Sequence, residues 1–323
     1  MHMLRNYIPA DRPAVAALWQ RSAVRQGYAP RTPGQLGPLL FEHPYFNSRH
    51  AFVWENGGGV GAFICGCTGD DIPRGGERGY FTCFLADEAL DTPALCADMF
   101  AALEESFCAA GKRCSAVTFF NPMRLPWVIP GTPGFEHNNM PGVAAGLPLH
   151  SRMLAQGYTE AARECAMYRS LEDFALPPEI KALETRLAAQ GCTVQPYDPA
   201  RHTGLAEMLA ALENPDWTAQ ITRAGRTGQL LPVALCGSVV AGFAGPVYPE
   251  PTGRGYFAGI GIAPAYQGRG LGRLLFFRLC QAEKEAGARY MSLFTGETNH
   301  ARKIYESAGF EQVRSFGVLV KEL

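Results

Sequence analysis

The chain has 323 residues, of which 47% are hydrophobic and 18% charged, and its formal net charge is −1. This length exceeds what a single hydrophobic core usually supports, so we expect two globular domains. The near-neutral charge argues against nucleic acid or an anionic membrane as the main partner, because both require a concentrated basic surface.

The N-terminal sequence MHMLRNYIPADR contains charged residues and a proline before any apolar run, which is not the pattern of a signal peptide. The longest apolar stretch, residues 233–248, is interrupted by glycines and a proline and is too short to cross a bilayer. We therefore expect a soluble, cytoplasmic protein without a membrane partner. No feature of the sequence indicates an oligomeric state.

Ten cysteines are scattered along the chain. There is no C-x-x-C pair, and no cysteine pair is matched by closely spaced histidines, so the spacing of zinc ligands is absent. We expect reduced, mostly buried cysteines and no metal site.

Three short sequences occur twice in the same order, which indicates a duplicated domain. Near the start of each copy, YIPA (residues 7–10) is echoed by YDPA (197–200). RGYF occurs at 78–81 and again at 254–257. Near the end of each copy, AQGY (155–158) corresponds to SAGF (307–310).

The first copy, predicted at residues 1–175, is the longer one. Its extra length falls mainly in residues 121–147, which are rich in Pro, Gly and Asn and show no periodicity, so we expect a loop without helix or strand. A loop of this length that carries Trp127, Phe135 and His137 is typical of a ligand-contacting segment. A tolerated surface insertion is the alternative.

Residues 176–191 are predicted as a linker, in which Leu176-Pro177-Pro178 precedes an amphipathic helix that ends at Gly191. The second copy, residues 192–323, shows hairpins first and strand–helix alternation later. This pattern predicts an α/β (α+β) domain with a mixed, mainly antiparallel sheet flanked by helices. The predicted strands are 193–196, 230–235, 238–245, 255–262, 290–294 and 310–319, and the predicted helices are 202–212, 271–286 and 301–307.

The segment that joins the strand before Ala263 to the helix from Leu271 carries the clearest chemical signal. Its sequence is QGRGLGR, residues 267–273, and its three alternating glycines allow the backbone to turn sharply and to approach a ligand. The start of the helix adds unpaired amides and about half a positive charge. Together they form an anion cradle suited to a pyrophosphate, to which Arg269 and Arg273 can add charge-assisted bonds.

A Rossmann dinucleotide site is the nearest alternative. It requires G-x-G-x-x-G after the first strand of a large parallel sheet. Here the third glycine comes too early, and too few residues follow Arg273 to build a doubly wound fold.

Gln267-x-x-Gly270-x-Gly272 resembles the acetyl-CoA signature (Q/R)xxGx(G/A) of the GCN5-related N-acetyltransferases (GNAT). The later block from Asn299 to Phe310, with Tyr305 inside it, is similar to a second conserved block of that family. The resemblance implies tandem GNAT-like domains of the type found in mycothiol synthase-like acetyltransferases.

The resemblance also implies roles for particular residues. The strand through Ile260, Gly261 and Ile262 would pair with the pantetheine arm of acetyl-CoA, beside a bulge. The pyrophosphate would be held by Gly268, Arg269, Gly270, Leu271, Gly272 and Arg273. Asn299 would hold the coenzyme arm, although the commonest form of the block places its asparagine at the position of Thr298.

Tyr305 is the predicted catalytic residue, because a phenol with a pKa of about 10 can protonate the leaving thiolate at neutral pH. The acceptor, a small-molecule or peptide amine, would attack directly once it is deprotonated. A core aromatic is the alternative reading of Tyr305. Four carboxylates are candidate general bases, as is a water chain: Glu207, Glu213, Asp216 and Glu250.

The first copy lacks the cradle. Its RGYF continues into TCFLADEALD, which has no glycine and places three carboxylates where a pyrophosphate would lie. We therefore expect a degenerate first domain and an acetyl-CoA-dependent N-acetyltransferase in the second. A non-catalytic acyl-CoA-binding or regulatory protein is the alternative function.

Overall fold

The computed structural model describes residues 2–57 and 59–323. The chain forms two compact units, which comprise residues 1–166 with 313–323, and residues 167–312. The chain passes from the first unit to the second within strand β9 (Thr159–Ser170) and returns within β17 (Glu311–Glu322). The boundaries predicted from the sequence, where the first copy ends at residue 175 and the second begins at residue 192, stay predictions.

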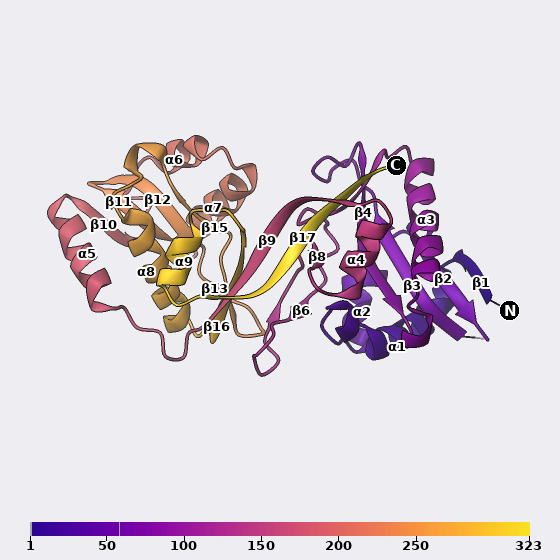
Figure 1. Cartoon of the computed structure of the whole chain (residues 1–323). Helices are drawn as coiled ribbons and strands as arrows, with labels where there is room; N and C mark the ends of the chain where they lie inside the picture. The colour runs from indigo at the N-terminus through magenta and orange to yellow at the C-terminus, as the bar shows by residue number, and fades with distance from the viewer. Residues whose placement is uncertain (1, 58) are drawn as a thin grey trace. The chain divides into compact units, whose positions relative to one another are not determined.

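Unit 1 is a sheet with helices on both faces (Figure 1). Its strand order is β1-β2-β3-β4-β5-β17, and all pairs are antiparallel except β4–β5. The strands are β1 (His2–Asn6), β2 (Ala51–Asn56), β3 (Gly59–Cys67), β4 (Arg78–Ala86) and β5 (Cys114–Val117). The helices are α1 (Arg12–Ser22), α2 (Pro33–Leu36), α3 (Pro93–Ala109) and α4 (Pro148–Ala155). Short helical turns are η1 (Pro9–Asp11), η2 (Val24–Gln26), η3 (Gly37–Phe41), η4 (Ser48–His50) and η5 (Glu88–Leu90).

Strand β4 is buried along almost its whole length because both faces of the sheet are covered. On one face, Leu18 and Trp19 of α1 pack in a core with Tyr80 and Leu85. On the other face, α3 forms a second core, in which Phe84 packs against Phe100 at 5.6 Å between ring centres. A continuous apolar strand is what burial on two faces requires.

Unit 2 repeats this layered plan. One sheet has the order β10-β11-β12-β15, and β16 pairs with β14, which pairs with β13. The strands are β10 (Cys192–Pro196), β11 (Pro232–Cys236), β12 (Val239–Gly245), β13 (Tyr248–Pro249), β14 (Arg254–Tyr256), β15 (Gly259–Ile262) and β16 (Tyr290–Gly296). The helices are α5 (Pro178–Ala189), α6 (Leu205–Ala211), α7 (Pro215–Thr227), α8 (Leu271–Glu285) and α9 (Arg302–Ser307), with a short turn η6 (Pro264–Tyr266).

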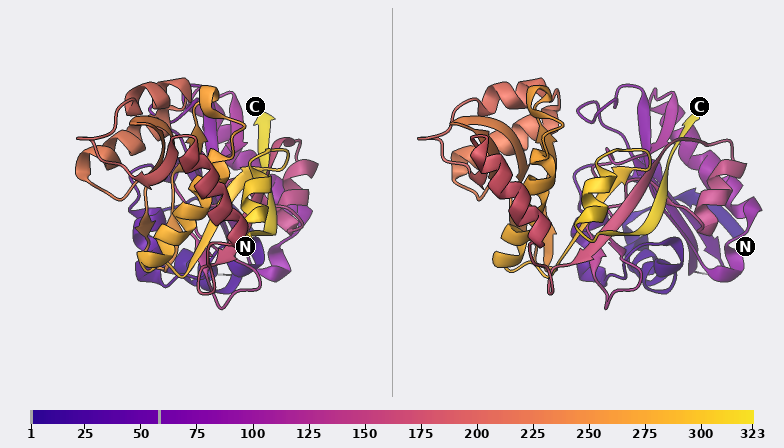
Figure 2. Two further views of the ribbon diagram at one scale, coloured as in Figure 1. Left: turned by 90° about the vertical axis from the view of Figure 1, so that its left-hand side faces the viewer. Right: turned by 60° about the vertical axis from the view of Figure 1, so that its left-hand side comes forward.

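The predicted linker helix is α5, and it packs in unit 2. Its buried residues Ile180, Leu183 and Leu187 join the core formed by α8. Glu184 also accepts hydrogen bonds from Arg278 of α8, and the two helices lie side by side (Figure 2). The segment therefore contributes to the second core.

The predicted duplication agrees with the strand pairing. In unit 1, β4 and β5 run parallel and Arg78 is opposite Cys114. In unit 2, β14 and β16 run parallel and Arg254 is opposite Tyr290, so both partners lie 176 residues further along the chain. The two RGYF sequences thus begin at corresponding points of two similar sheets. The prediction of mixed, mainly antiparallel sheets flanked by helices is confirmed.

The final strand differs from the expectation that residues 310–319 would complete the second copy. Strand β17 pairs with β5 in unit 1, where Leu319 is opposite Val117. Strand β16 of unit 2 has as its neighbour β9, the last strand of the first copy. Unit 1 therefore includes most of the last strand of the second copy, and the neighbour of β16 in unit 2 is the last strand of the first copy.

The prediction that residues 121–147 form neither helix nor strand is wrong. They include β6 (Trp127–Val128) and β7 (Glu136–His137), which pair with each other, and β8 (Val143–Ala144), which pairs with β17. Trp127 and Ile129 are fully buried, and the Trp127 indole donates to the Asn139 carbonyl at 3.0 Å. The segment is thus part of the core of unit 1, and replacing it with a Gly-Ser link would remove buried apolar surface.

The prediction that all ten cysteines are reduced is wrong for one pair. Cys192 and Cys236 face each other across β10 and β11 and form a disulfide. The other eight are free thiols. In the described residues, no cluster of three or more His, Cys, Asp or Glu side chains is arranged to hold a metal ion. None of the described helices is both long and apolar enough to cross a membrane.

Candidate acetyl-CoA site

The site predicted from the sequence lies on the strand–turn–helix from β15 to α8 in unit 2. The strand that was predicted over 255–262 is divided into β14 and β15, which have different partners. The division falls at Phe257 and Ala258, where the Ala258 N–H donates to the Gly245 carbonyl at 2.9 Å. After this point β15 pairs with β12, whereas β14 pairs with β16.

Strand β15 has one free edge, because it is the last strand of its sheet in the described chain. The Ala263 N–H donates to the Ala241 carbonyl of β12, so by antiparallel alternation Ile260 and Ile262 direct their backbone groups away from β12. The Gln267 side chain donates to the Ile262 carbonyl at 2.9 Å, which agrees with this direction. Ile260 therefore presents backbone N–H and C=O groups at an open edge.

The glycines of β15 allow two side chains from the region of α6 and α7 to lie close to the strand. A Cβ atom on Gly259 would lie 2.4 Å from the Trp217 indole, and one on Gly261 would lie 2.5 Å from Leu212. The pairing of β15 with β12 shows no register shift from Gly259 to Ile262, so the bulge expected there is not found. The irregularity of this segment lies instead at Phe257 and Ala258, the two residues between β14 and β15.

The glycine loop has the backbone conformation of an anion cradle. Gly268 and Gly270 have φ angles of +75° and +94°, which other residues rarely adopt. Gly270 is the N-cap of α8, whose first-turn amides have no intrahelical acceptor. A Cβ on Gly268 would meet no atom within 4 Å, so the space in front of the loop is open. Such a concave run of N–H groups suits a phosphate.

Two arginines flank this loop. Arg269 is exposed and lies over the Tyr266 ring, 5.4 Å from its centre. Arg273 lies 4.0 Å from Glu179, and its Nε is buried without a hydrogen-bond partner in the described structure. Both guanidinium groups can add charge-assisted hydrogen bonds to an anion bound at the loop.

Tyr305 is buried in the core beside α8, and its ring centre lies 4.8 Å from that of Phe276. Burial raises the pKa of Tyr305 to about 12, so the phenol stays protonated throughout the physiological range. The described residues include no hydrogen-bond partner for its hydroxyl. The hydroxyl is therefore available to donate to a ligand.

Asn299 has a local structural role. Its side chain accepts from the Ala301 N–H at 2.9 Å, and its carbonyl accepts from Arg302 at 3.1 Å. Asn299 is exposed and holds the turn before α9. The contact between Asn299 and the coenzyme stays a prediction.

The four candidate bases fall into two groups. Glu250 binds the buried guanidinium of Arg254 at 2.8 and 2.9 Å, so its carboxylate is already paired. The other three are exposed and lie in α6, after it, or in the first turn of α7: Glu207, Glu213 and Asp216. The structure does not single out one of them as a base.

Trp217 supports the site through contacts that the sequence did not indicate. Its indole N–H donates to the Ala258 carbonyl at 3.0 Å, at the point where β14 and β15 separate. Its ring also packs on Phe243, with ring centres 5.4 Å apart. The local signal was Asn214-Pro215, an N-cap followed by proline, which marks the start of α7.

The comparisons with known proteins identify this part of the chain. Residues 198–310 match the model of the acetyltransferase (GNAT) family. This segment belongs to the GNAT family. A [ribosomal protein bS18]-alanine N-acetyltransferase of Haemophilus influenzae is 44% identical over 54 residues, which are 17% of this chain and 37% of that protein. The chain thus covers little more than a third of the length of this relative.

Solved structures extend the GNAT fold to the whole chain. A GCN5-related N-acetyltransferase from Sphaerobacter thermophilus has a TM-score of 0.61 at 15% identity, over 99% of this chain and 95% of that one. A tandem GNAT protein from the clavulanic acid biosynthesis pathway has a TM-score of 0.59 at 14% identity, over 100% and 98%. At these identities the likeness concerns the fold alone, and it is the fold of a tandem GNAT protein.

The first GNAT-like unit differs from the second at the positions that correspond to the free edge of β15 and to the start of α8. Phe84 and Ala86 correspond to Ile260 and Ile262 in the repeat, and the backbone of both is already engaged by side chains. The Phe84 backbone N–H lies against the Tyr28 hydroxyl, and the Ala86 carbonyl accepts from Arg25. At the start of α3 the Thr92 hydroxyl accepts from the Leu95 N–H at 3.3 Å, where α8 has only glycine.

We therefore predict one acetyl-CoA site per chain, in the second unit. Titration calorimetry with the full chain should give a stoichiometry of one. A variant with Gly268→Asp should lose this single binding event, because the added carboxylate would face the pyrophosphate. Two equal sites, or one site that survives the substitution, would contradict the assignment.

Glu283 of α8 is a buried carboxyl group outside the cradle, and it provides a second prediction. Its Oε1 accepts from the Tyr248 N–H at 3.0 Å, and its Oε2 has no partner in the described structure. Burial raises the pKa of Glu283 to about 8, and the backbone bond from Tyr248 and the charge of Arg254 oppose that shift. Between about pH 5 and pH 8 the unfolded chain loses this proton while the folded chain keeps it, so the free energy of unfolding falls as pH rises.

Glu283→Gln removes this pH dependence. The stability of the variant relative to wild type should rise by up to about 1.4 kcal/mol per pH unit between about pH 5 and pH 8. Urea unfolding of both proteins at pH 5.5 and pH 8 measures the difference. The same difference at both pH values would show that Glu283 is ionised in the folded protein.

Proposed function

We propose that the protein transfers an acetyl group from acetyl-CoA to an amine by direct attack, without a covalent enzyme intermediate. The observation that carries the proposal is the combination of an open glycine cradle at α8 with an unpartnered, protonated Tyr305 hydroxyl in the same GNAT unit. Either feature alone would fit a binding protein. Together they supply an anion site and a proton donor.

In this proposal the free edge of β15 pairs with the pantetheine arm through the backbone of Ile260 and Ile262. The amides of the loop and the first turn of α8 hold the pyrophosphate, aided by Arg269 and Arg273. The neutral amine attacks the thioester carbon, the C–S bond breaks, and Tyr305 donates a hydrogen bond or a proton to the departing sulfur. The proton of the amine leaves to a base or to solvent.

The acceptor is proposed only as an amine. The relative from Haemophilus influenzae is named as a [ribosomal protein bS18]-alanine N-acetyltransferase, so the α-amine of a peptide that begins with alanine is one candidate acceptor. An α-amine has a pKa of about 8, which leaves a larger neutral fraction at pH 7 than a lysine with a pKa of about 10.4. A small-molecule amine is the other candidate.

The experiment is a turnover assay of the full chain with acetyl-CoA, in which thiol release and product mass are both measured. The acceptors are alanine-starting peptides, the same peptides with a blocked N-terminus, and a panel of small amines. Acetylated product that depends on a free amine supports the proposal. Acetyl-CoA binding without turnover on any acceptor or in cell extract would favour a non-catalytic acyl-CoA-binding protein.

A further inference from the structure

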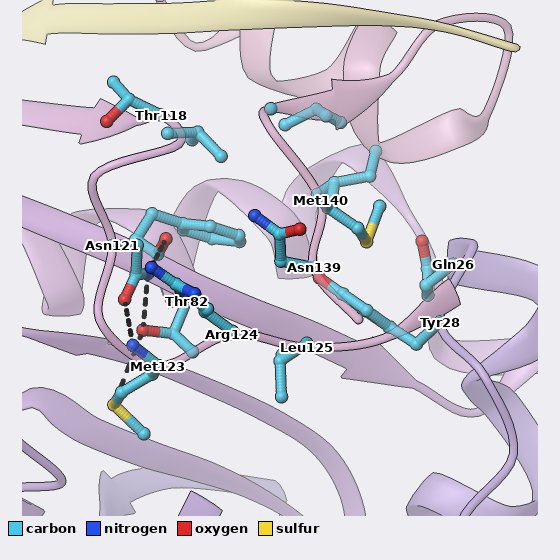
Figure 3. A pocket seen from close by; sticks show the side chains of 15 residues that line it. Gln26, Tyr28, Thr82, Thr118, Asn121, Met123, Arg124, Leu125, Asn139 and Met140 are labelled. Carbon is cyan, nitrogen blue, oxygen red and sulfur yellow. Dashed lines mark hydrogen bonds between the residues drawn. The ribbon is translucent and has the colours of Figure 1, made fainter. Parts of the chain in front are cut away.

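Unit 1 contains a pocket at the point where β4 and β5 diverge (Figure 3). The parallel pairing ends at Tyr80 opposite Ala116, and the pocket begins with the residues that follow on each strand. By the 176-residue repeat, this is the counterpart of the division between β14 and β16 in unit 2. The first copy therefore retains a pocket at this position of the fold.

The walls of the pocket come from the strands and from the segment 121–147. Thr82 of β4 and Thr118 after β5 line one part, and Met123, Asn139 and Met140 line another. Asn121 is fully engaged, because its amide donates to the Phe81 carbonyl at 3.0 Å and its oxygen accepts from the Met123 N–H at 2.9 Å. Asn121 thus fixes the pocket wall.

Gln26 supplies an unpartnered acceptor. It is only 2% exposed, and its Nε2 donates to the Asp91 carboxylate at 3.1 Å. A carboxylate only accepts, so this bond fixes which end of the amide is nitrogen. The other end, Oε1, is buried and has no hydrogen-bond partner in the described structure. A ligand group with an N–H or O–H would satisfy it.

Asn139 supplies an amide on another wall. Asn139 is 4% exposed, and its main-chain carbonyl accepts a hydrogen bond from the Trp127 indole. Its side-chain amide has no hydrogen-bond partner among the described residues and points into the pocket between Met140 and Asn121 (Figure 3). Gln26 and Asn139 both line the pocket, so its walls contain one buried acceptor without a partner and one amide that can donate.

The charge of the lining restricts the ligand. Of the fifteen lining residues, only Arg124 carries a charge at neutral pH, and its side chain is exposed near the ring of Phe119. An ionic ligand would lose its hydration without a buried counter-charge. A neutral polar group avoids that loss.

The size of the pocket restricts the ligand further. The cavity volume is about 40 Å³. One water needs about 10–15 Å³ of such a cavity, so about three waters or a group of three or four heavy atoms can fit. This is the size of a carboxamide with one small substituent.

We propose that the pocket of unit 1 binds a carboxamide group, either as a small molecule or at the tip of a larger one. Its N–H would donate to Gln26 Oε1, and its carbonyl would accept from the Asn139 side chain. Its apolar substituent would contact the thioethers of Met123 and Met140. The proposal concerns a second ligand site and does not depend on acetyl transfer in unit 2.

The test uses NMR of the full chain labelled with ¹³C at the methionine methyl groups, with acetamide as the probe. Acetamide should shift the Met123 and Met140 signals saturably in the millimolar range and leave Met208 of unit 2 unchanged. N,N-Dimethylacetamide, which lacks N–H groups, and acetate, which is charged, should bind at least tenfold more weakly. Gln26→Met and Asn139→Leu should each weaken acetamide binding at least tenfold, whereas Gln190→Met, at an exposed position, should not.

Three outcomes would overturn the proposal: shifts that never saturate, equal binding of acetamide and dimethylacetamide, or unchanged binding in Asn139→Leu. Gln26→Met also removes the bond to Asp91 and could disturb unit 1, which the methionine signals themselves would report. In that event Asn139→Leu and the two control ligands decide the question, since neither depends on Gln26.

Discussion

Replacing Tyr305 by phenylalanine is expected to lower kcat by about 10²- to 10⁴-fold while acetyl-CoA affinity stays nearly unchanged. The hydroxyl has no partner in the described structure, so its removal breaks no internal hydrogen bond. The ring, which packs on Phe276 at 4.8 Å, is retained. The change therefore removes the proton donor and little else.

The pH dependence separates this role from packing. Because burial raises the pKa of Tyr305 to about 12, the phenol remains protonated as pH rises through 9, while a larger fraction of the amine becomes neutral. Wild-type kcat/KM should therefore rise with pH without a decline caused by Tyr305. The variant should follow the same profile at a lower level if the hydroxyl acts only on the leaving group.

Phe276→Leu is the matched control. It disturbs the ring packing around Tyr305 but keeps the hydroxyl, and it should lower stability more than Tyr305→Phe does. Steady-state and single-turnover assays, with unfolding curves for both variants, make the comparison. If chemistry limits the rate and Tyr305→Phe leaves kcat unchanged, Tyr305 is a packing residue.

The elements of the second copy could be predicted where the signal is local. The periodic apolar residues from Leu271 predict α8, and Cys236-Gly237 predicts the hairpin between β11 and β12. Helix α7 was missed because its residues are mostly polar and exposed, with only Ile221 and Ala224 buried. Its start at Asn214 could have been predicted from the N-cap and the proline that follows.

Features that depend on contacts distant in sequence could not be predicted. The Cys192–Cys236 disulfide arises from the pairing of β10 with β11, which the spacing of the two cysteines does not reveal. The placement of β17 against β5 in unit 1 depends on a choice between two similar sheets. A repeat in the sequence shows that both sheets exist, but not which strand each one takes.

The candidate site also combines features that a local sequence encodes with features that depend on distant contacts. The glycine loop could be predicted because a short sequence specifies its φ angles and the helix start that follows. The contacts that support or replace this site could not be predicted. Trp217 holds the Ala258 carbonyl from a helix 41 residues earlier, and Tyr28 occupies the edge of β4 from 56 residues earlier. Both act through contacts that no local pattern encodes.

Gly270→Asp is expected to abolish acetyl-CoA binding, with a loss of affinity of at least about 10²- to 10³-fold. At an effective dielectric of about 20, two unit charges about 4 Å apart repel by about 4 kcal/mol, which corresponds to roughly that factor. The carboxylate would stand at the N-cap of α8, where the pyrophosphate is proposed to bind.

The backbone at this position requires a careful control. Gly270 has a φ of +94°, and a Cβ there would lie 3.1 Å from Leu183 and 3.7 Å from Arg186, so any side chain adds strain. Gly270→Asn has nearly the same shape and tolerates positive φ about as well as aspartate does, but carries no charge. Both variants should lose similar stability in thermal unfolding.

The difference between the two variants isolates the charge. Calorimetry with acetyl-CoA should show measurable binding for Gly270→Asn and none for Gly270→Asp. The pair Gly268→Asn and Gly268→Asp repeats the comparison where a Cβ meets no atom within 4 Å, so steric effects are smaller. If both aspartate variants fold and bind acetyl-CoA as tightly as their asparagine partners, the glycine loop does not hold the pyrophosphate, and the cradle must be assigned elsewhere in the unit.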